Sequence, residues 1–172
     1  MHPDLSDHTD PDARTRTYTW PARPESDVRN NVYAGLEAMQ RVVSGQTPLS
    51  PGAATLGVTL TAVAPGRATM TATPGDWAVN AGGTVHGGIV SGWVDSALGY
   101  STATVLEPGT GYSTLDLTVR YIAALHLEHT PATIEAEVEH AGRSTAVVRV
   151  LVHDTRGRLC ASASGVMMLF RI

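Results

Sequence analysis

The sequence predicts an α+β fold in which an antiparallel sheet packs against one buried helix. Three observations support this fold class. Segments in which apolar and polar residues alternate lie on both sides of residues 87–105. Residues 87–105 are themselves small or apolar on all sides, which is typical of a buried helix rather than a surface helix. The expected order is one helix, two strands, the buried helix and four more strands, which differs from the alternating strands and helices of a parallel sheet.

The N-terminal part is expected to lie outside the sheet. Residues 1–25 are rich in acidic residues, Arg and Pro and lack hydrophobic periodicity, so we expect a disordered tail, in which Tyr18 or Trp20 could still dock on the domain. Apolar residues then recur at helical spacing up to Gly45. A helix followed by a linker is therefore predicted over residues 26–53.

The main domain is expected over residues 54–172. Its buried helix carries four glycines, each of which costs up to about 1 kcal/mol in a helix interior. That cost is tolerable where other backbone packs closely on the helix, as when a sheet wraps around it. Gly109 to Gly111 are expected in a loop. The alternating patterns predict strands at residues 56–62, 68–72, 114–121, 134–139, 144–153 and 159–170.

Composition excludes several classes of function. The 172 residues are 42% apolar, so a folded core is expected. The sequence contains no run of 18 apolar residues, so a membrane span is not expected. The net charge is −4 and all twelve basic residues are Arg, without a basic block, so nucleic-acid binding is not expected. No secretory signal is visible, and a single cysteine, Cys160, allows neither an intramolecular disulfide nor a Cys-based zinc site. We therefore expect a soluble, cytoplasmic protein.

Two features of the sequence are candidates for a catalytic role. Asp95 is the one charged residue within the predicted buried helix, where a carboxylate is costly unless it is paired, hydrogen-bonded or functional. The alternative is an Asp at an exposed edge of the helix. The second feature is the run from Asn80 to His86, Gly87 and Gly88, which opens the same helix. Free N–H groups and the positive dipole end at a helix start suit an anion or a carbonyl that becomes an oxyanion. The alternative is a glycine-rich turn in which the hydrogen-bonding groups of the histidine have structural partners.

In combination these residues resemble the hotdog-fold acyl-CoA thioesterases, in particular the phenylacetate-degradation (PaaI-like) family. That family's pattern is an Asn, a His-Gly-Gly that begins six residues later, and an Asp nine residues after the His. Asn80, His86 with its two glycines, and Asp95 match it, and the strand at 114–121 looks like the family's hydroxyl-bearing strand. The resemblance covers roughly residues 54–172. It implies an antiparallel sheet wrapped around a long central helix, here with an extra N-terminal helix.

The resemblance also implies roles for these residues in hydrolysis of an acyl- or aryl-CoA thioester. Asp95 would act as nucleophile or general base on the thioester carbonyl. The N–H of Gly87, supported by Asn80 and His86, would polarise that carbonyl, and Thr114 would help to place the water or the carboxylate. No metal or redox cofactor is implied, because CoA is part of the substrate.

Two further residues belong to the expected site. Gly88 would contribute to substrate binding at the helix start. The loop before the strand varies in length in the family, so the hydroxyl could come from Ser113 instead of Thr114. Thr114 is preferred because it keeps the family spacing to Asp116 and Tyr121.

The spacing along the helix has a consequence for assembly. Asp95 lies nine residues after His86, and at a rise of about 1.5 Å per residue the two are roughly 13 Å apart along the axis. One straight helix cannot aim both at the same carbonyl. We therefore expect a homodimer with two shared sites, as in the family, and the dimers could pair into tetramers.

Other interpretations remain open. A hotdog hydratase would use an Asp and a nearby His, but here Asp76 precedes Asn80 without that His. A non-catalytic acyl-CoA-binding module is a further alternative. Cys160 has no neighbouring His to activate it, so a structural cysteine is expected. A metal site was considered and is not expected in the polar loop that carries His126, Glu128 and His129.

Overall fold

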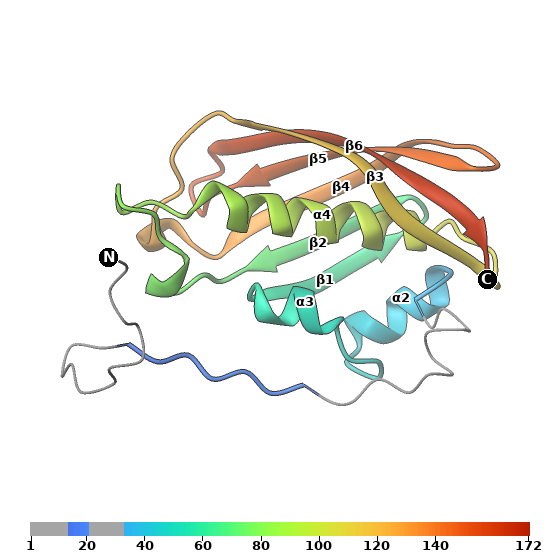
Figure 1. Cartoon of the computed structure of the whole chain (residues 1–172), viewed down its shortest axis with the longest axis horizontal. Coiled ribbons are helices and arrows are strands. Elements are labelled where there is room, and N and C mark those ends of the chain that lie inside the picture. The colour runs from blue at the N-terminus through green and yellow to red at the C-terminus, as the bar shows by residue number, and fades with distance from the viewer. Residues whose placement is uncertain (1–13, 21–32) are drawn as a thin grey trace, which may run out of the picture.

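The computed structural model describes residues 14–20 and 33–172, and its centre is a six-stranded antiparallel sheet that curves around one long helix (Figure 1). The strand order is β1-β2-β4-β5-β6-β3, so β1 and β3 form the two edges. The predicted α+β class and the order of the elements are confirmed. The strands are β1 Val58–Ala64, β2 Arg67–Ala72, β3 Thr110–Tyr121, β4 Ala132–Ala141, β5 Thr145–His153 and β6 Leu159–Arg171.

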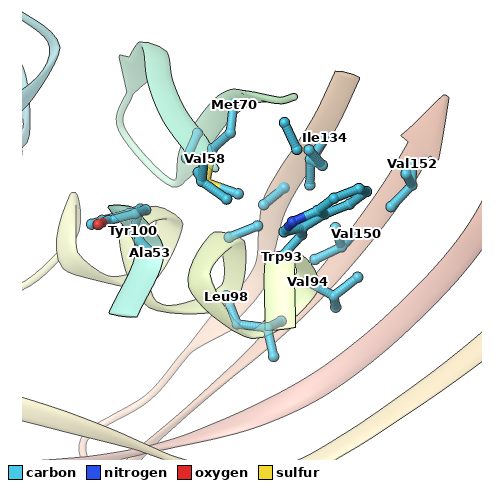
Figure 2. Packing of buried hydrophobic residues seen from close by; sticks show 14 of the residues in the cluster. Ala53, Val58, Met70, Trp93, Val94, Leu98, Tyr100, Ile134, Val150 and Val152 are labelled. Atoms are coloured by element: carbon cyan, nitrogen blue, oxygen red, sulfur yellow. The ribbon is translucent and has the colours of Figure 1, made fainter. Parts of the chain in front are cut away.

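The long helix α4, Gly87–Ala103, lies on the concave face of the sheet. Figure 2 shows Trp93, Val94 and Leu98 of α4 packed among side chains from the strands, such as Ile134 and Val150. All five are completely buried. Full burial of one such side chain contributes about 1.5–3 kcal/mol, so this contact stabilises the fold substantially.

Glycines allow α4 to approach its neighbours closely. A Cβ at Gly92 would stand 2.7 Å from a methyl carbon of Leu56, and a Cβ at Gly99 would stand 3.1 Å from the ring of Tyr112. The first distance is too short for any real Cβ. The cost of glycine in the helix interior is therefore offset by close packing, but the atoms that approach these two glycines belong to side chains and not to the backbone expected from the sequence.

The N-terminal region differs from the prediction in two places. Helix α2 spans Leu36–Val43, and Gly35 before it has a φ of 92° that no continuing α-helix adopts. The predicted helix therefore does not run unbroken through this point, and its first part lies outside the described residues. The predicted linker contains a second short helix, α3, Pro51–Thr55, whose proline stands at the favoured first helical position.

Residues 14–20 contact the domain through Arg16, whereas the sequence predicts a disordered tail in which Tyr18 or Trp20 could dock. The Arg16 guanidinium stacks on the ring of Trp77 at 3.4 Å and lies over the ring of Tyr18 at 4.3 Å. The same group donates a hydrogen bond to the carbonyl oxygen of Thr55, the last residue of α3. Part of the predicted tail, residues 14–20, thus lies against the domain through Arg16. The rest of the predicted tail lies outside the described residues.

Strand β3 begins earlier than predicted and contains a β-bulge. Gly111, expected in a loop, is already part of the strand. Thr114 pairs with Met167 and Asp116 with Val166, so Leu115 is the extra residue. Simple alternation places Thr114 and Leu117 on opposite faces of the strand. The bulge brings both to the inner face, while the side chain of Leu115 is 58% exposed.

Among the described residues, no helix is long and apolar enough to cross a membrane.

Candidate active site

Asp95 and Thr114 meet at the middle of α4. The Thr114 hydroxyl donates a 2.7 Å hydrogen bond to Oδ1 of Asp95 and lies 3.7 Å from the sulfur of Met167. The β3 bulge makes this contact possible because it turns Thr114 inward. Ser113 lines the same pocket, but it is Thr114 that bonds the carboxylate. Of the two hydroxyls considered, the structure brings Thr114 to Asp95.

The environment of Asp95 differs from the expectation of a fully buried helix. Asp95 is exposed in the single chain, as are His86 and Gly88, whereas every residue from Ala97 to Ala103 is buried. The first half of α4 is therefore open along one side. Asp95 keeps access to solvent and to a ligand without the full cost of desolvating a carboxylate.

A pocket of about 770 Å³ lies beside Asp95. Its wall includes Gly52 and Ala53 of α3, which sequence reasoning treated as a linker. Another part of the wall holds a hydroxyl pair, Ser50 and Tyr100, whose oxygens are 3.3 Å apart. Burial raises the pKa of Tyr100, so this phenol stays neutral and can act only as a neutral hydrogen-bonding group near pH 7. The remaining wall is mainly apolar: Leu56, Tyr112, Met167, Phe170 and Ile172.

Asn80 shapes the loop that precedes α4. Its Oδ1 accepts hydrogen bonds from the N–H groups of Gly82, at 2.8 Å, and Thr84, at 3.3 Å. Its Nδ2 donates to the Thr84 hydroxyl at 3.0 Å. Each polar atom of the Asn80 side chain thus bonds within the loop. In the single chain Asn80 acts on the shape of the loop that leads to the helix N-terminus.

His86 caps α4. Its Nδ1 accepts a 2.9 Å hydrogen bond from the N–H of Gly88, so in the neutral ring the proton sits on Nε2. The N–H of Gly88 is consequently engaged, whereas among the described residues the N–H of Gly87 has no hydrogen-bond partner. The helix start therefore offers one free backbone donor beside the exposed His86 ring.

Asn80 and Gly87 line a second, separate pocket of about 360 Å³. Tyr121, which sequence reasoning noted only for its spacing, stands over Gly87 in this pocket, and buried Cys160 also contributes to its wall. None of the residues that line this pocket lines the pocket of Asp95. One chain therefore holds two separate candidate half-sites, Asp95 with Thr114 and, apart from them, Asn80 with Gly87.

Other candidate residues have ordinary surroundings. His126 and His129 stand edge to face, with ring centres 6.2 Å apart; His126 precedes a short 3-10 turn, Leu127–His129, and His129 ends it. In the described part of the chain no three His, Cys, Asp or Glu side chains converge as metal ligands would. Burial raises the pKa of the Cys160 thiol, and the carboxylate of Asp154 acts in the same direction, so this thiol stays protonated.

Known proteins resemble this chain in sequence and in fold. Residues 82–161, which include α4 and β3, match the model of the thioesterase superfamily. A protein of Saccharolobus solfataricus described as an esterase is 31% identical over 90 residues, which are 52% of this chain and 58% of that protein. The chain thus matches little more than half of the length of this relative.

Solved structures extend the similarity to most of the domain. A phenylacetic acid degradation-related protein from Ralstonia eutropha JMP134 superposes with a TM-score of 0.69 at 26% identity, over 76% of this chain and 98% of that one. A hypothetical thioesterase from Streptococcus pneumoniae TIGR4, crystallised with coenzyme A, shares the fold at a TM-score of 0.60 and 24% identity, over 66% of this chain and 86% of that one. These matches confirm that the chain has the hotdog fold and resembles the PaaI-like thioesterases.

Proposed function

We propose that the protein hydrolyses an acyl- or aryl-CoA thioester to the free acid and CoA. The observation that carries the proposal is the Asp95 carboxylate, oriented by Thr114 at the edge of a mainly apolar pocket. The match to the thioesterase superfamily supports this reaction class. The coenzyme A in the crystals of the Streptococcus pneumoniae thioesterase supports CoA as the carrier of the acyl group.

The chemistry follows from the two half-sites. The free N–H of Gly87, at the positive end of the α4 dipole, donates to the thioester oxygen and stabilises the negative charge that develops there. The Nε2–H of His86 adds a second donor, while Asn80 holds the loop in shape. Asp95 then attacks the carbonyl carbon directly, or removes a proton from an attacking water.

In both routes the C–S bond breaks and the sulfur leaves with CoA. Direct attack forms an acyl-aspartyl anhydride that water hydrolyses, whereas general-base attack delivers the water oxygen to the acid in one step. A single turnover in ¹⁸O-water tests for the anhydride. Label in the Asp95 carboxylate identifies an anhydride that water opens at the aspartyl carbonyl, whereas label in the acid alone fits general-base attack or an anhydride that water opens at the acyl carbonyl, and trapping with hydroxylamine separates these two.

A second copy of the chain completes each site in this proposal. Two groups on one helix, roughly 13 Å apart along its axis, cannot both reach one carbonyl group. Edge strand β3 offers a surface for the second copy, because among the described strands it pairs with β6 alone and Leu115 is 58% exposed on it. A two-fold axis beside β3 would bring Asp95 of one copy toward Gly87 of the other.

The test is thiol release from a panel of CoA esters by the wild type and by Asp95→Asn. We expect the wild type to turn over at least one ester and Asp95→Asn to lower kcat by about 10²-fold or more, the scale of a lost acid–base group. Glu107→Gln, an exposed carboxylate-to-amide change in the loop after α4, is the matched control and should retain full activity. Thermal stabilisation by CoA esters without turnover would contradict the proposal and favour a binding module.

A further inference from the structure

Tyr121, the last residue of β3, reaches over the first turn of α4. Its hydroxyl donates a 2.8 Å hydrogen bond to the carbonyl oxygen of Gly87, and it lies 2.6 Å from the hydroxyl of Ser91. The ring covers Gly87 so closely that a Cβ there would be 3.1 Å from the ring carbon Cζ. Tyr121 is nevertheless 56% exposed, so these polar contacts, more than burial, determine where its hydroxyl lies.

These contacts form a chain of hydrogen bonds with one direction. A phenol has a single hydrogen, which here goes to Gly87, so Ser91 must be the donor in its contact with Tyr121. The Gly87 carbonyl and the Gly88 N–H belong to the same peptide group, and that N–H donates to Nδ1 of His86. The chain therefore runs from Ser91 through Tyr121 and this peptide group to His86. Hydrogen bonds in such a chain polarise one another and strengthen together.

The end of the chain lies at the half-site that binds the thioester oxygen. An accepting Nδ1 requires the proton on Nε2, so the chain selects the His86 tautomer that presents a donor outward. The peptide group between Gly87 and Gly88 is held at both ends, by Tyr121 and by His86. Holding this peptide group also restricts the direction of the Gly87 N–H, which belongs to the peptide group before it.

We propose that Tyr121 is a positioning residue for the thioester-binding half-site, acting through the first peptide group of α4 on the His86 tautomer and on the Gly87 N–H. The expected effect on kcat rests on the proposed thioesterase function, whereas the expected effect on the His86 tautomer does not. Tyr121 itself contacts the helix and not the reacting atoms. Its effect is therefore expected in the chemical step more than in substrate affinity.

Tyr121→Phe tests this role, because it keeps the ring over Gly87 and removes only the hydroxyl. We expect kcat for the best ester to fall about five-fold, equivalent to about 1 kcal/mol, with KM nearly unchanged. Tyr18→Phe removes a hydroxyl outside both half-sites and should leave kcat unchanged. If Tyr121→Phe does not fold, Ser91→Ala breaks the first link of the chain and should change kcat in the same direction by a smaller factor.

A second readout does not depend on catalysis. Nitrogen-15 NMR of the neutral imidazoles, with His86→Gln to assign the signals, should show His86 as the pure Nε2–H form in the wild type. In Tyr121→Phe the Nδ1–H form should appear. Unchanged kcat, or an unchanged His86 tautomer in Tyr121→Phe, would overturn the role of Tyr121. A wild type that cleaves no ester would overturn the proposed function instead, and the NMR result would still decide the role of Tyr121.

Discussion

Two adjacent hydroxyls illustrate how a single residue determines the candidate site. Ser113 and Thr114 both line the pocket of Asp95, yet it is Thr114 that bonds the carboxylate. Thr114→Val keeps the shape of the side chain and removes the donor. Because a hydrogen bond to a charged group is worth about 1.5–3 kcal/mol, we expect kcat to fall roughly ten-fold or more.

Ser113→Ala is the matched control for Thr114→Val and should stay near the wild-type rate in the same thiol-release assay. The reverse ranking, with Ser113→Ala the slower enzyme, would assign the hydroxyl to Ser113 and contradict the geometry.

Asp154 provides a prediction about pH and stability. Burial raises the pKa of this 3%-exposed carboxyl, but hydrogen bonds from the N–H groups of Arg158 and Arg156 and from the Arg158 guanidinium outweigh it, so the pKa lies below its ordinary value. A pKa lower in the folded than in the unfolded state stabilises the fold above the unfolded pKa, near 4. That stabilisation is lost as the pH falls through the folded pKa.

We therefore expect Asp154→Asn to lower the melting temperature at pH 7, and the difference from the wild type to shrink as the pH falls below about 4. Thermal unfolding followed by circular dichroism across this pH range measures it. The exposed Glu128→Gln serves as control and should show little difference at any pH. If Asp154→Asn lowers the melting temperature by the same amount at every pH, packing in the turn and not ionisation is responsible.

At the residue scale, the sequence identified the candidate chemistry but not its surroundings. Asp95 stood out because it is the one charge among small and apolar helix residues. Whether Asp95 is buried or exposed could not be predicted, because a helix that is apolar all round does not reveal which side the sheet leaves open. The inward position of Thr114 depends on the bulge at Leu115, and nothing in a simple alternating pattern predicts an extra residue there.

At the scale of elements, the segment around Arg16 carries the clearest prediction. Arg16 joins the end of α3 to the Trp77 ring, and α3 forms part of the pocket wall. Arg16→Gln should lower the melting temperature by a few degrees, since a cation–π contact contributes about 0.5–2 kcal/mol. Arg14→Gln is the matched control, because the contact that Arg14 makes within the described residues is an exposed ion pair with Asp76 at 3.6 Å.

A truncated protein that starts at Ser26 should show the same loss as Arg16→Gln, and α3 should become more sensitive to protease in both. This differs from what the composition of the segment implies, since its charges and prolines suggest a free tail. Equal melting temperatures for Arg14→Gln and Arg16→Gln would restore that simpler interpretation.

The helices before the sheet show why elements of different length are predicted with different success. The strands are long enough for their alternation to be clear in the sequence, and α4 is recognised as a long run of small and apolar residues. Helix α3 has only five residues, fewer than two turns, so no periodic pattern can develop. The break before α2 depends on the left-handed conformation of Gly35, and the sequence alone does not show that a glycine in a helical pattern has a positive φ.

At the scale of the whole molecule, the assembly of the site from two chains can be tested by complementation. Asp95→Asn and Asn80→Ala proteins are mixed in equal amounts and allowed to exchange subunits. A mixed dimer then holds one site with both defects and one site with neither. Random exchange should restore about one quarter of the wild-type activity from two nearly inactive proteins.

Exchange itself is verified by native mass spectrometry of chains with different masses. Mixed dimers without recovered activity would mean that each site is built within one chain. The spacing from His86 to Asp95 was sufficient to predict separate half-sites, and the two distinct pockets agree with it. The surface that joins two copies was not predictable in the same way, because the exposure of β3 emerges only when the sheet is formed.

The separation of the two pockets also makes the reaction sensitive to dilution. If each site combines Asp95 of one copy with Gly87 of another, a single chain has no activity. The number of complete sites then follows the law of mass action. Far below the dissociation constant of the pair, the rate rises with the square of the chain concentration, and each two-fold dilution halves the activity per milligram. Far above it, the activity per milligram is constant. A dilution series of the unmodified protein therefore measures subunit association through the reaction rate alone.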